Sequence, residues 1–261
     1  MAPPATRCLI ALGANQGDRR ATLDRACDQL AAADGVLVVD RSRWLTSTPV
    51  GGPAGQGEFA NGAAAIDTTL PPDALLDTLH AIEAGHGRVR RVRWAARPLD
   101  LDLLLYGDRA IRTDRLRVPH PRMTVRPFVL GPAASIAPDW RHPELGATLA
   151  ELFDRLRHGA DAVRVAGGET DCAAVAPLLA ELLPGWTRSW HAGEETWRNA
   201  TPNGGVTPGR SAAPKLQILA DADAAPQAGT PCLPLAEFPR ADWRDEVAAA
   251  VRCVWPALGE R

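Results

Sequence analysis

The sequence predicts an α+β protein, a ferredoxin-like sandwich over residues 1–160 with a small C-terminal α/β appendage over 161–261. Three observations predict it. Strand-like and helix-like segments alternate through the first part in the order β-α-β-β-α-β. Further helical stretches follow that order within the same part. The appendage is instead broken by two linker-like stretches rich in Pro, Gly and Ala, at 199–214 and 221–234.

The first half of that order has clear boundaries. Residues 7–12 form an apolar run that ends at Gly13, which is typical of a buried strand. Asp18 is a candidate N-cap, because apolar residues follow it at spacings of three and four until Gly35. The β-branched run 36–45 predicts the next strand.

The second half repeats the pattern. A strand over 59–69 is followed by a helix that Pro71-Pro72-Asp73 opens. Strand 98–106 carries leucines on both faces toward its end, so we expect it to be central in the sheet. Helical stretches at 125–136 and 147–156 close the first unit.

The appendage has weaker signals. Apolar residues at helical spacing predict helices over 172–182 and 242–255, the second capped by Asp242, and 216–219 predicts a strand. Five of the eight tryptophans lie here, which indicates packed structure. Residues 163–168, with two glycines before a helix, could open a nucleotide-binding unit, but packing on the first unit or oligomerisation is the favoured role.

Composition excludes several classes of protein. The 261 residues carry 29 basic and 31 acidic side chains, a formal net charge of -2, and are 46% hydrophobic. No stretch approaches the roughly 18 uncharged apolar residues of a membrane span. Five scattered cysteines without a C-x-x-C spacing predict neither a disulfide framework nor a zinc ribbon. No secretory signal is evident, so we expect a cytoplasmic protein that binds no membrane.

The positive charge is concentrated locally. Lys215 is the only lysine, and residues 88–126 hold 11 Arg against four Asp, a net charge of +7. Such a segment in a near-neutral chain favours a polyanionic small molecule over nucleic acid. The alternative is a solvated Arg-rich face.

Asp100-Leu101-Asp102 is the strongest chemical signal. Two residues along a strand span ~6.6 Å and place both carboxylates on one face. Mg²⁺ is typically held by one or two carboxylates together with water and substrate phosphates. The alternative is a solvated strand face, for which Asp is a poor choice. The Walker P-loop, the dinucleotide fingerprint and the zinc-protease motif are all missing from the sequence.

Several longer motifs then give a resemblance. They are Ala11-Leu12-Gly13-Ala14-Asn15, Pro49-Val50-Gly51, Phe59-Ala60-Asn61, Gly87-Arg88-x-Arg90, Trp94-x-x-Arg97-Pro98-Leu99-Asp100-Leu101-Asp102, Val118-Pro119-His120-Pro121-Arg122-Met123-x-x-Arg126-x-Phe128 and Ile136-Ala137-Pro138-Asp139. With these motifs in this order, the chain resembles the 6-hydroxymethyl-7,8-dihydropterin pyrophosphokinase family over roughly residues 7–158.

The resemblance implies an α/β/α fold and an activity. The family moves the terminal pyrophosphoryl group of ATP to the pterin hydroxymethyl oxygen, releases AMP, and uses two Mg²⁺ ions in folate biosynthesis. Asp100 and Asp102 would bind both ions. Catalytic roles would fall to these two and to Arg88, Arg90 and Arg97 on a mobile loop. ATP would be bound by His80, Glu83, Trp94, Arg115, His120 and Arg126. The pterin would be bound by Ser47, Thr48, Val50, Phe59, Asn61 and Phe128.

The chain also departs from the family pattern. Ala14 replaces the usual Ser, and Ala95-Ala96 replaces the usual Gly-Pro before Arg97. Neither change removes a carboxylate or a key arginine, so we expect activity. Two alternatives stay open: a pterin or nucleotide binder whose catalytic loop has decayed, and a protein whose role lies in the appendage. The sequence does not predict an oligomeric state.

Overall fold

The computed structural model describes residues 4–53, 55–87, 96–191, 194–199 and 213–256. The chain divides into two compact units. The first consists of 1–123 and 128–144, and the second of 124–127 and 145–261. Each unit has its own sheet. Within the described residues no helix is both long enough and apolar enough to cross a membrane.

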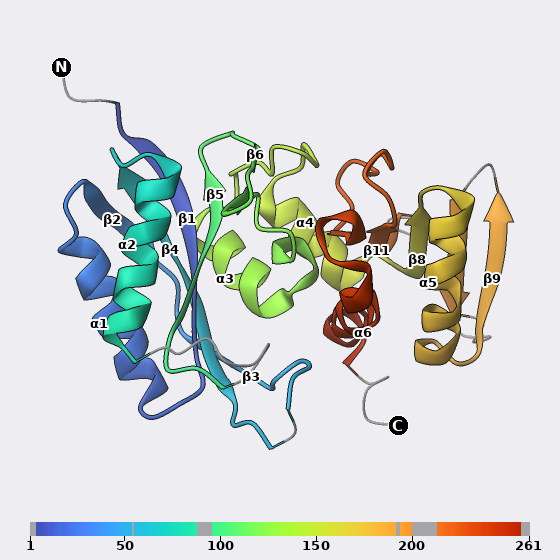
Figure 1. The fold of residues 1–261 in the computed structure, drawn as a ribbon, viewed down its shortest axis with the longest axis horizontal. Helices are drawn as coiled ribbons and strands as arrows, with labels where there is room; N and C mark the ends of the chain where they lie inside the picture. Colours follow the sequence, from blue (N-terminus) through green and yellow to red (C-terminus); the bar gives the residue numbers. More distant parts are fainter. Residues whose placement is uncertain (1–3, 54, 88–95, 192–193, 200–212, 257–261) are drawn as a thin grey trace. The chain divides into compact units, whose positions relative to one another are not determined.

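The sheet of the first unit is antiparallel throughout and has the strand order β2-β4-β1-β5, with β3 pairing the other end of β4 (Figure 1). Its strands are β1 (Thr6–Ala14), β2 (Val36–Arg41), β3 (Leu45–Ser47), β4 (Phe59–Thr68) and β5 (Asp100–Tyr106). A separate two-stranded hairpin follows, made of β6 (Ile111–Arg112) and β7 (Arg117–Val118). This order confirms the α+β class and matches the predicted ferredoxin-like arrangement.

Two helices cover one face of this sheet, α1 (Arg19–Ala31) and α2 (Pro72–Gly85) (Figure 1). The predicted cap of α1 is confirmed, because the Asp18 carboxylate accepts the Ala21 N–H at 3.1 Å. Leu23 and Leu79 are fully buried in the core beneath the helices. Helix α3 (Pro127–Ile136) lies on the opposite side of the sheet (Figure 1).

Two strand predictions were wrong in detail. The predicted strand 36–45 is interrupted at 42–44, where Trp44 turns in and lies directly on the backbone of Gly62. Strand β5 is at the sheet edge, not central. Its leucines are buried on both faces, and the segment after β7 runs beside it, with the His120 N–H donating to the Leu104 carbonyl at 3.0 Å.

The second unit has a mixed sheet in the order β12-β11-β8-β10-β9. Strands β8, β11 and β12 are parallel, while β10 is antiparallel to both of its neighbours. Its elements are α4 (Leu149–His158), β8 (Ala160–Ala166), α5 (Glu169–Leu182), β9 (Trp186–His191), β10 (Glu194–Asn199), β11 (Pro214–Leu219), β12 (Cys232–Pro234) and α6 (Trp243–Val254). Helices α5 and α6 pack over one apolar core with β8 and β11.

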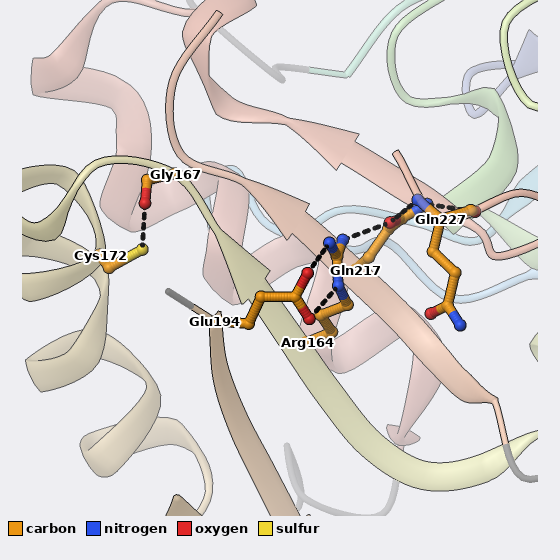
Figure 2. Close-up of polar contacts among 6 residues, drawn as sticks. All are labelled: Arg164, Gly167, Cys172, Glu194, Gln217 and Gln227. Atoms are coloured by element: carbon orange, nitrogen blue, oxygen red, sulfur yellow. Dashed lines mark hydrogen bonds and ion pairs between the residues drawn. The ribbon is translucent and has the colours of Figure 1, made fainter. Parts of the chain in front are cut away.

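A ladder of polar side chains crosses three strands of this sheet (Figure 2). Arg164 on β8 donates to Glu194 on β10, with 2.9 Å between Nε and Oε2, and to Gln217 on β11 at 3.0 Å. The Gln217 side chain also accepts the Gln227 N–H at 2.7 Å. Burial makes this last pairing important, since Gln217 is completely inaccessible to solvent.

Several predictions for this unit need correction or qualification. Asp242 precedes α6, but its side chain makes no capping hydrogen bond. The predicted linker 221–234 contains strand β12. Most of the other linker, 200–212, lies outside the described residues.

Candidate active site

The candidate site is organised around Gly13, near the end of central strand β1. Gly13 pairs with Asn61 of β4 on one side and with Asp100 of β5 on the other. A Cβ atom on Gly13 would lie 3.3 Å from Asn61 Oδ1 and 3.9 Å from Asp100 Cβ. Because β1 is antiparallel to both neighbours, its last residues lie beside the first residues of β4 and β5, at the same end of the three strands.

Asp100 and Asp102 present their carboxylates on the same face of β5, opposite Leu101 and Leu103 in the core. Arg97 Nη1 is 2.6 Å from Asp100 Oδ2, with both side chains 21% exposed. The two predicted carboxylates are therefore accessible and partly compensated by positive charge.

His120 stands beside the second carboxylate, with 3.7 Å between its Nε2 and Asp102 Oδ2. Its Nδ1 accepts the Arg122 N–H at 3.2 Å. The hydrogen of the neutral ring is therefore assigned to Nε2, on the side of Asp102.

The donor set fits Mg²⁺. It supplies two carboxylates on one strand face, and the described residues contain no cluster of three or more potential protein ligands. Mg²⁺ commonly uses one or two carboxylates and completes its shell with water and substrate phosphate. The carboxylates suit a cation that arrives with a polyphosphate.

Three of the predicted pterin residues, Ser47, Phe59 and Asn61, lie together on β3 and β4, on the other side of Gly13. Asn61 is 6% exposed, and its Nδ2 donates to Ser47 Oγ at 2.8 Å. Ser47 pairs with Phe59 across β3 and β4. Thr48 and Val50 continue the chain directly from Ser47, and Phe128 is half-buried on α3.

The predicted ATP residues come from several elements. Glu83 of α2 is buried, and its Oε1 accepts the N–H of Leu101 at 2.7 Å. Leu101 is the residue between the two aspartates in sequence. His80 lies one helical turn earlier on α2. Arg115 pairs with Asp77, with 2.6 Å between Nη2 and Oδ1, and this hydrogen bond raises the pKa of Arg115.

Four predicted residues are not placed with this group. Arg88, Arg90 and Trp94 lie outside the described residues. Arg126 belongs to the short segment 124–127 of the second unit. Their roles stay predictions.

Asn15 was not among the residues predicted for the site, although it belongs to the motif Ala11-Leu12-Gly13-Ala14-Asn15. Asn15 Oδ1 accepts the Arg97 N–H at 2.7 Å. The available signal was an amide residue directly after a buried strand that ends in small residues. The motif did not reveal its partner, because Arg97 is 82 residues away in sequence.

In the second unit, the turn at Gly167 and Gly168 before α5 is already paired with a carboxylate of the protein. The Gly168 N–H, at the start of α5, donates to the Asp221 carboxylate. The Asp223 N–H donates to the same side chain at 3.0 Å. A protein carboxylate thus already occupies the position that favours negative charge at a helix N-terminus.

Comparison with known proteins identifies the first unit. Residues 9–138 match the family model of 7,8-dihydro-6-hydroxymethylpterin-pyrophosphokinase. A 2-amino-4-hydroxy-6-hydroxymethyldihydropteridine pyrophosphokinase of Synechocystis is 40% identical over 174 residues, covering 67% of this chain and 81% of the relative. The protein of the same name from Pseudomonas aeruginosa is 46% identical over 147 residues, covering 56% of this chain and 90% of the relative.

Proposed function

Because the chain belongs to the 7,8-dihydro-6-hydroxymethylpterin-pyrophosphokinase family, we propose that the site around Gly13 carries the family's reaction. The chain is a transferase, a pyrophosphokinase of folate biosynthesis that uses ATP. In the reaction the hydroxymethyl oxygen of the pterin attacks the β-phosphorus of ATP. The bond from that phosphorus to the α-phosphate oxygen breaks, and AMP leaves.

One observation carries the assignment of this site. Gly13 brings Asn61 and Asp100 against opposite sides of a single strand. An amide that can pair with the edge of a heterocycle therefore lies beside a carboxylate that can hold a metal–polyphosphate. Placing the attacking oxygen close to the reacting phosphorus is the main requirement of such a transfer.

On the phosphate side, Asp100 and Asp102 would hold two Mg²⁺ ions. When bound, these ions neutralise charge on the phosphate oxygens and polarise the reacting phosphorus. Arg97, with Arg88 and Arg90, would donate to phosphate oxygens and stabilise the charge that develops there. The remaining contacts to ATP are assigned to His80, Glu83, Trp94, Arg115, His120 and Arg126.

On the pterin side, Asn61 would pair its amide with the polar edge of the ring. Phe59 and Phe128 offer aromatic faces for stacking on a flat heterocycle. Ser47, Thr48 and Val50 would line the same region. The Asn61–Ser47 hydrogen bond fixes the amide before substrate arrives, which reduces the ordering cost of binding.

The test is an assay for AMP. The full chain is incubated with ATP, Mg²⁺ and 6-hydroxymethyl-7,8-dihydropterin, and nucleotides are separated by chromatography. We expect one AMP for each pyrophosphorylated pterin, and none without the pterin. Formation of ADP would mean single-phosphoryl transfer and would contradict the proposal. Tight pterin binding without AMP would favour a binding protein.

A further inference from the structure

Asn15 contacts two segments that are distant in sequence. Its backbone N–H donates to the Arg97 carbonyl at 3.2 Å, and its Oδ1 accepts the Arg97 N–H at 2.7 Å. Its Nδ2 donates to Gln56 Oε1 at 3.3 Å. Asn15 is itself 8% exposed. One buried amide therefore connects the end of β1 to both segments.

The contact with Arg97 bears on the phosphate side of the site. Two hydrogen bonds to one backbone fix both the position and the direction of the chain at Arg97. From that fixed point the Arg97 guanidinium reaches Asp100 at 2.6 Å. A displacement of about 1 Å in a phosphate-binding group is enough to slow transfer strongly.

The contact with Gln56 bears on the pterin side. Gln56 Nε2 donates to the Pro53 carbonyl at 3.2 Å, so this side chain contacts Pro53 as well as Asn15. Gly51 and Gly52 in the same segment have φ of 76° and 77°, a conformation that favours glycine. Thr48 and Val50, which the proposed function assigns to the pterin, precede Gln56 by only a few residues. A shift of these residues as the pterin binds would therefore reach Gln56.

We propose that Asn15 is a positioning residue that couples pterin binding at Thr48 and Val50, through Gln56, to the placement of Arg97 on the phosphate side. This inference rests on the proposed function. It predicts that pterin and nucleotide each tighten the binding of the other, and that the Asn15–Gln56 contact carries part of this coupling. A residue with a merely structural role would change stability or both affinities without changing their ratio.

The experiment measures binding without turnover. Pterin affinity is determined by calorimetry for the full chain with Mg²⁺, with and without a non-hydrolysable ATP analogue. Gln56→Met removes the hydrogen bond but keeps the length of the side chain and the Asn15–Arg97 contact. We expect the analogue to tighten pterin binding about tenfold in the wild type and about twofold or less in Gln56→Met. Gln16→Met, at an exposed neighbouring glutamine, is the matched control and should keep the wild-type ratio.

Asn15→Ala extends the test, because it removes both side-chain contacts. We expect it to lose the coupling and also to lower kcat, with nucleotide affinity changed less. Should Asn15→Ala fail to fold, Gln56→Met alone decides the question. A wild-type ratio near one, or an unchanged ratio in Gln56→Met, would overturn the proposal. Failure of the wild type to bind the pterin at all would instead refute the proposed function, and this inference would fall with it.

Discussion

The guanidinium of Arg97 lies against the carboxylate of Asp100, with 2.6 Å between Nη1 and Oδ2 and only 21% of each side chain exposed. The pair joins the residue assigned to the phosphates to one assigned to the metal. Each group therefore offsets part of the charge of the other, which lowers the net charge that an incoming magnesium–nucleotide complex meets at this point.

Replacing Arg97 should therefore have two separate effects. Arg97→Ala removes a phosphate donor, and we expect kcat/KM to fall about a hundredfold. The same change removes one positive charge next to Asp100, so Mn²⁺ should bind a few fold more tightly in the absence of nucleotide. Steady-state kinetics and paramagnetic resonance of free Mn²⁺ measure the two effects. Arg97→Lys keeps the charge but not the bidentate geometry of the guanidinium, so its kcat/KM should lie between those of the wild type and Arg97→Ala. Full activity in Arg97→Ala would rule out its phosphate role.

Asp100→Asn and Asp102→Asn test the proposal that these two carboxylates hold Mg²⁺. Each change keeps size and a polar oxygen but removes a charged ligand. We expect folded variants that still bind pterin, with activity lowered at least about a hundredfold and only partly restored by excess Mg²⁺. Asp108→Asn, in the exposed turn after β5, is the control and should retain activity. Near-normal turnover in either site variant would defeat the assignment of a two-ion centre.

Asp77 offers a way to tighten ATP binding. Its carboxylate pairs with Arg115 at 2.6 Å, and both side chains are more than half exposed. Asp77→Asn leaves Arg115 available to the nucleotide, so KM for ATP should fall about twofold to fivefold with kcat unchanged. The gain should shrink at 0.5 M salt, roughly, because exposed charges are screened there. Asp28→Asn, at an exposed position of α1, serves as control. An unchanged KM for ATP would place Arg115 outside the nucleotide site.

Gly62 should tolerate no side chain. A Cβ atom there would come within 2.3 Å of the Trp44 ring. The methyl group of Gly62→Ala must push the Trp44 indole away from β4, and we expect the free energy of unfolding to fall by about 1–3 kcal/mol. Gly85→Ala, where an added Cβ meets nothing within 4 Å, should be neutral or slightly stabilising. Urea denaturation measures both, and equal stability of the two variants would contradict this packing.

His142 should make stability depend on pH. The side chain is 5% exposed, and burial lowers its pKa from 6.5 to about 4. Above pH 6.5 the ring is neutral in both states, so it contributes no pH dependence. Between pH 6.5 and 4 the unfolded chain binds the proton and the folded chain does not, so stability falls as pH falls, by up to about 3 kcal/mol.

The check on His142 compares two denaturation series. His142→Gln cannot take up that proton, so its stability should fall less steeply than that of the wild type between pH 7 and pH 4. Other titrating groups are common to both proteins and cancel in the difference. Parallel curves would show that the folded ring is protonated as readily as the unfolded one.

The sequence by itself determined the local elements and the chemistry they carry. Period-two alternation placed Asp100 and Asp102 on one face of a strand, and both carboxylates are accessible on β5. Asp18 was recognisable as a helix cap because capping involves residues only three apart. Strands β9 and β10 were not recognised, because their tryptophans, arginines and glutamates hide the alternation.

Only the tertiary structure decided which of these groups meet. Asn61 and Asp100 come together across Gly13 through strand register, and register depends on pairing between segments far apart in sequence. The same holds for Asn15 and Arg97, which lie 82 residues apart, and for Trp44, which divides a predicted strand by packing on Gly62. Local patterns report which conformation a segment prefers. Contacts between segments depend on how the whole chain buries its apolar surface, and no local pattern contains that information.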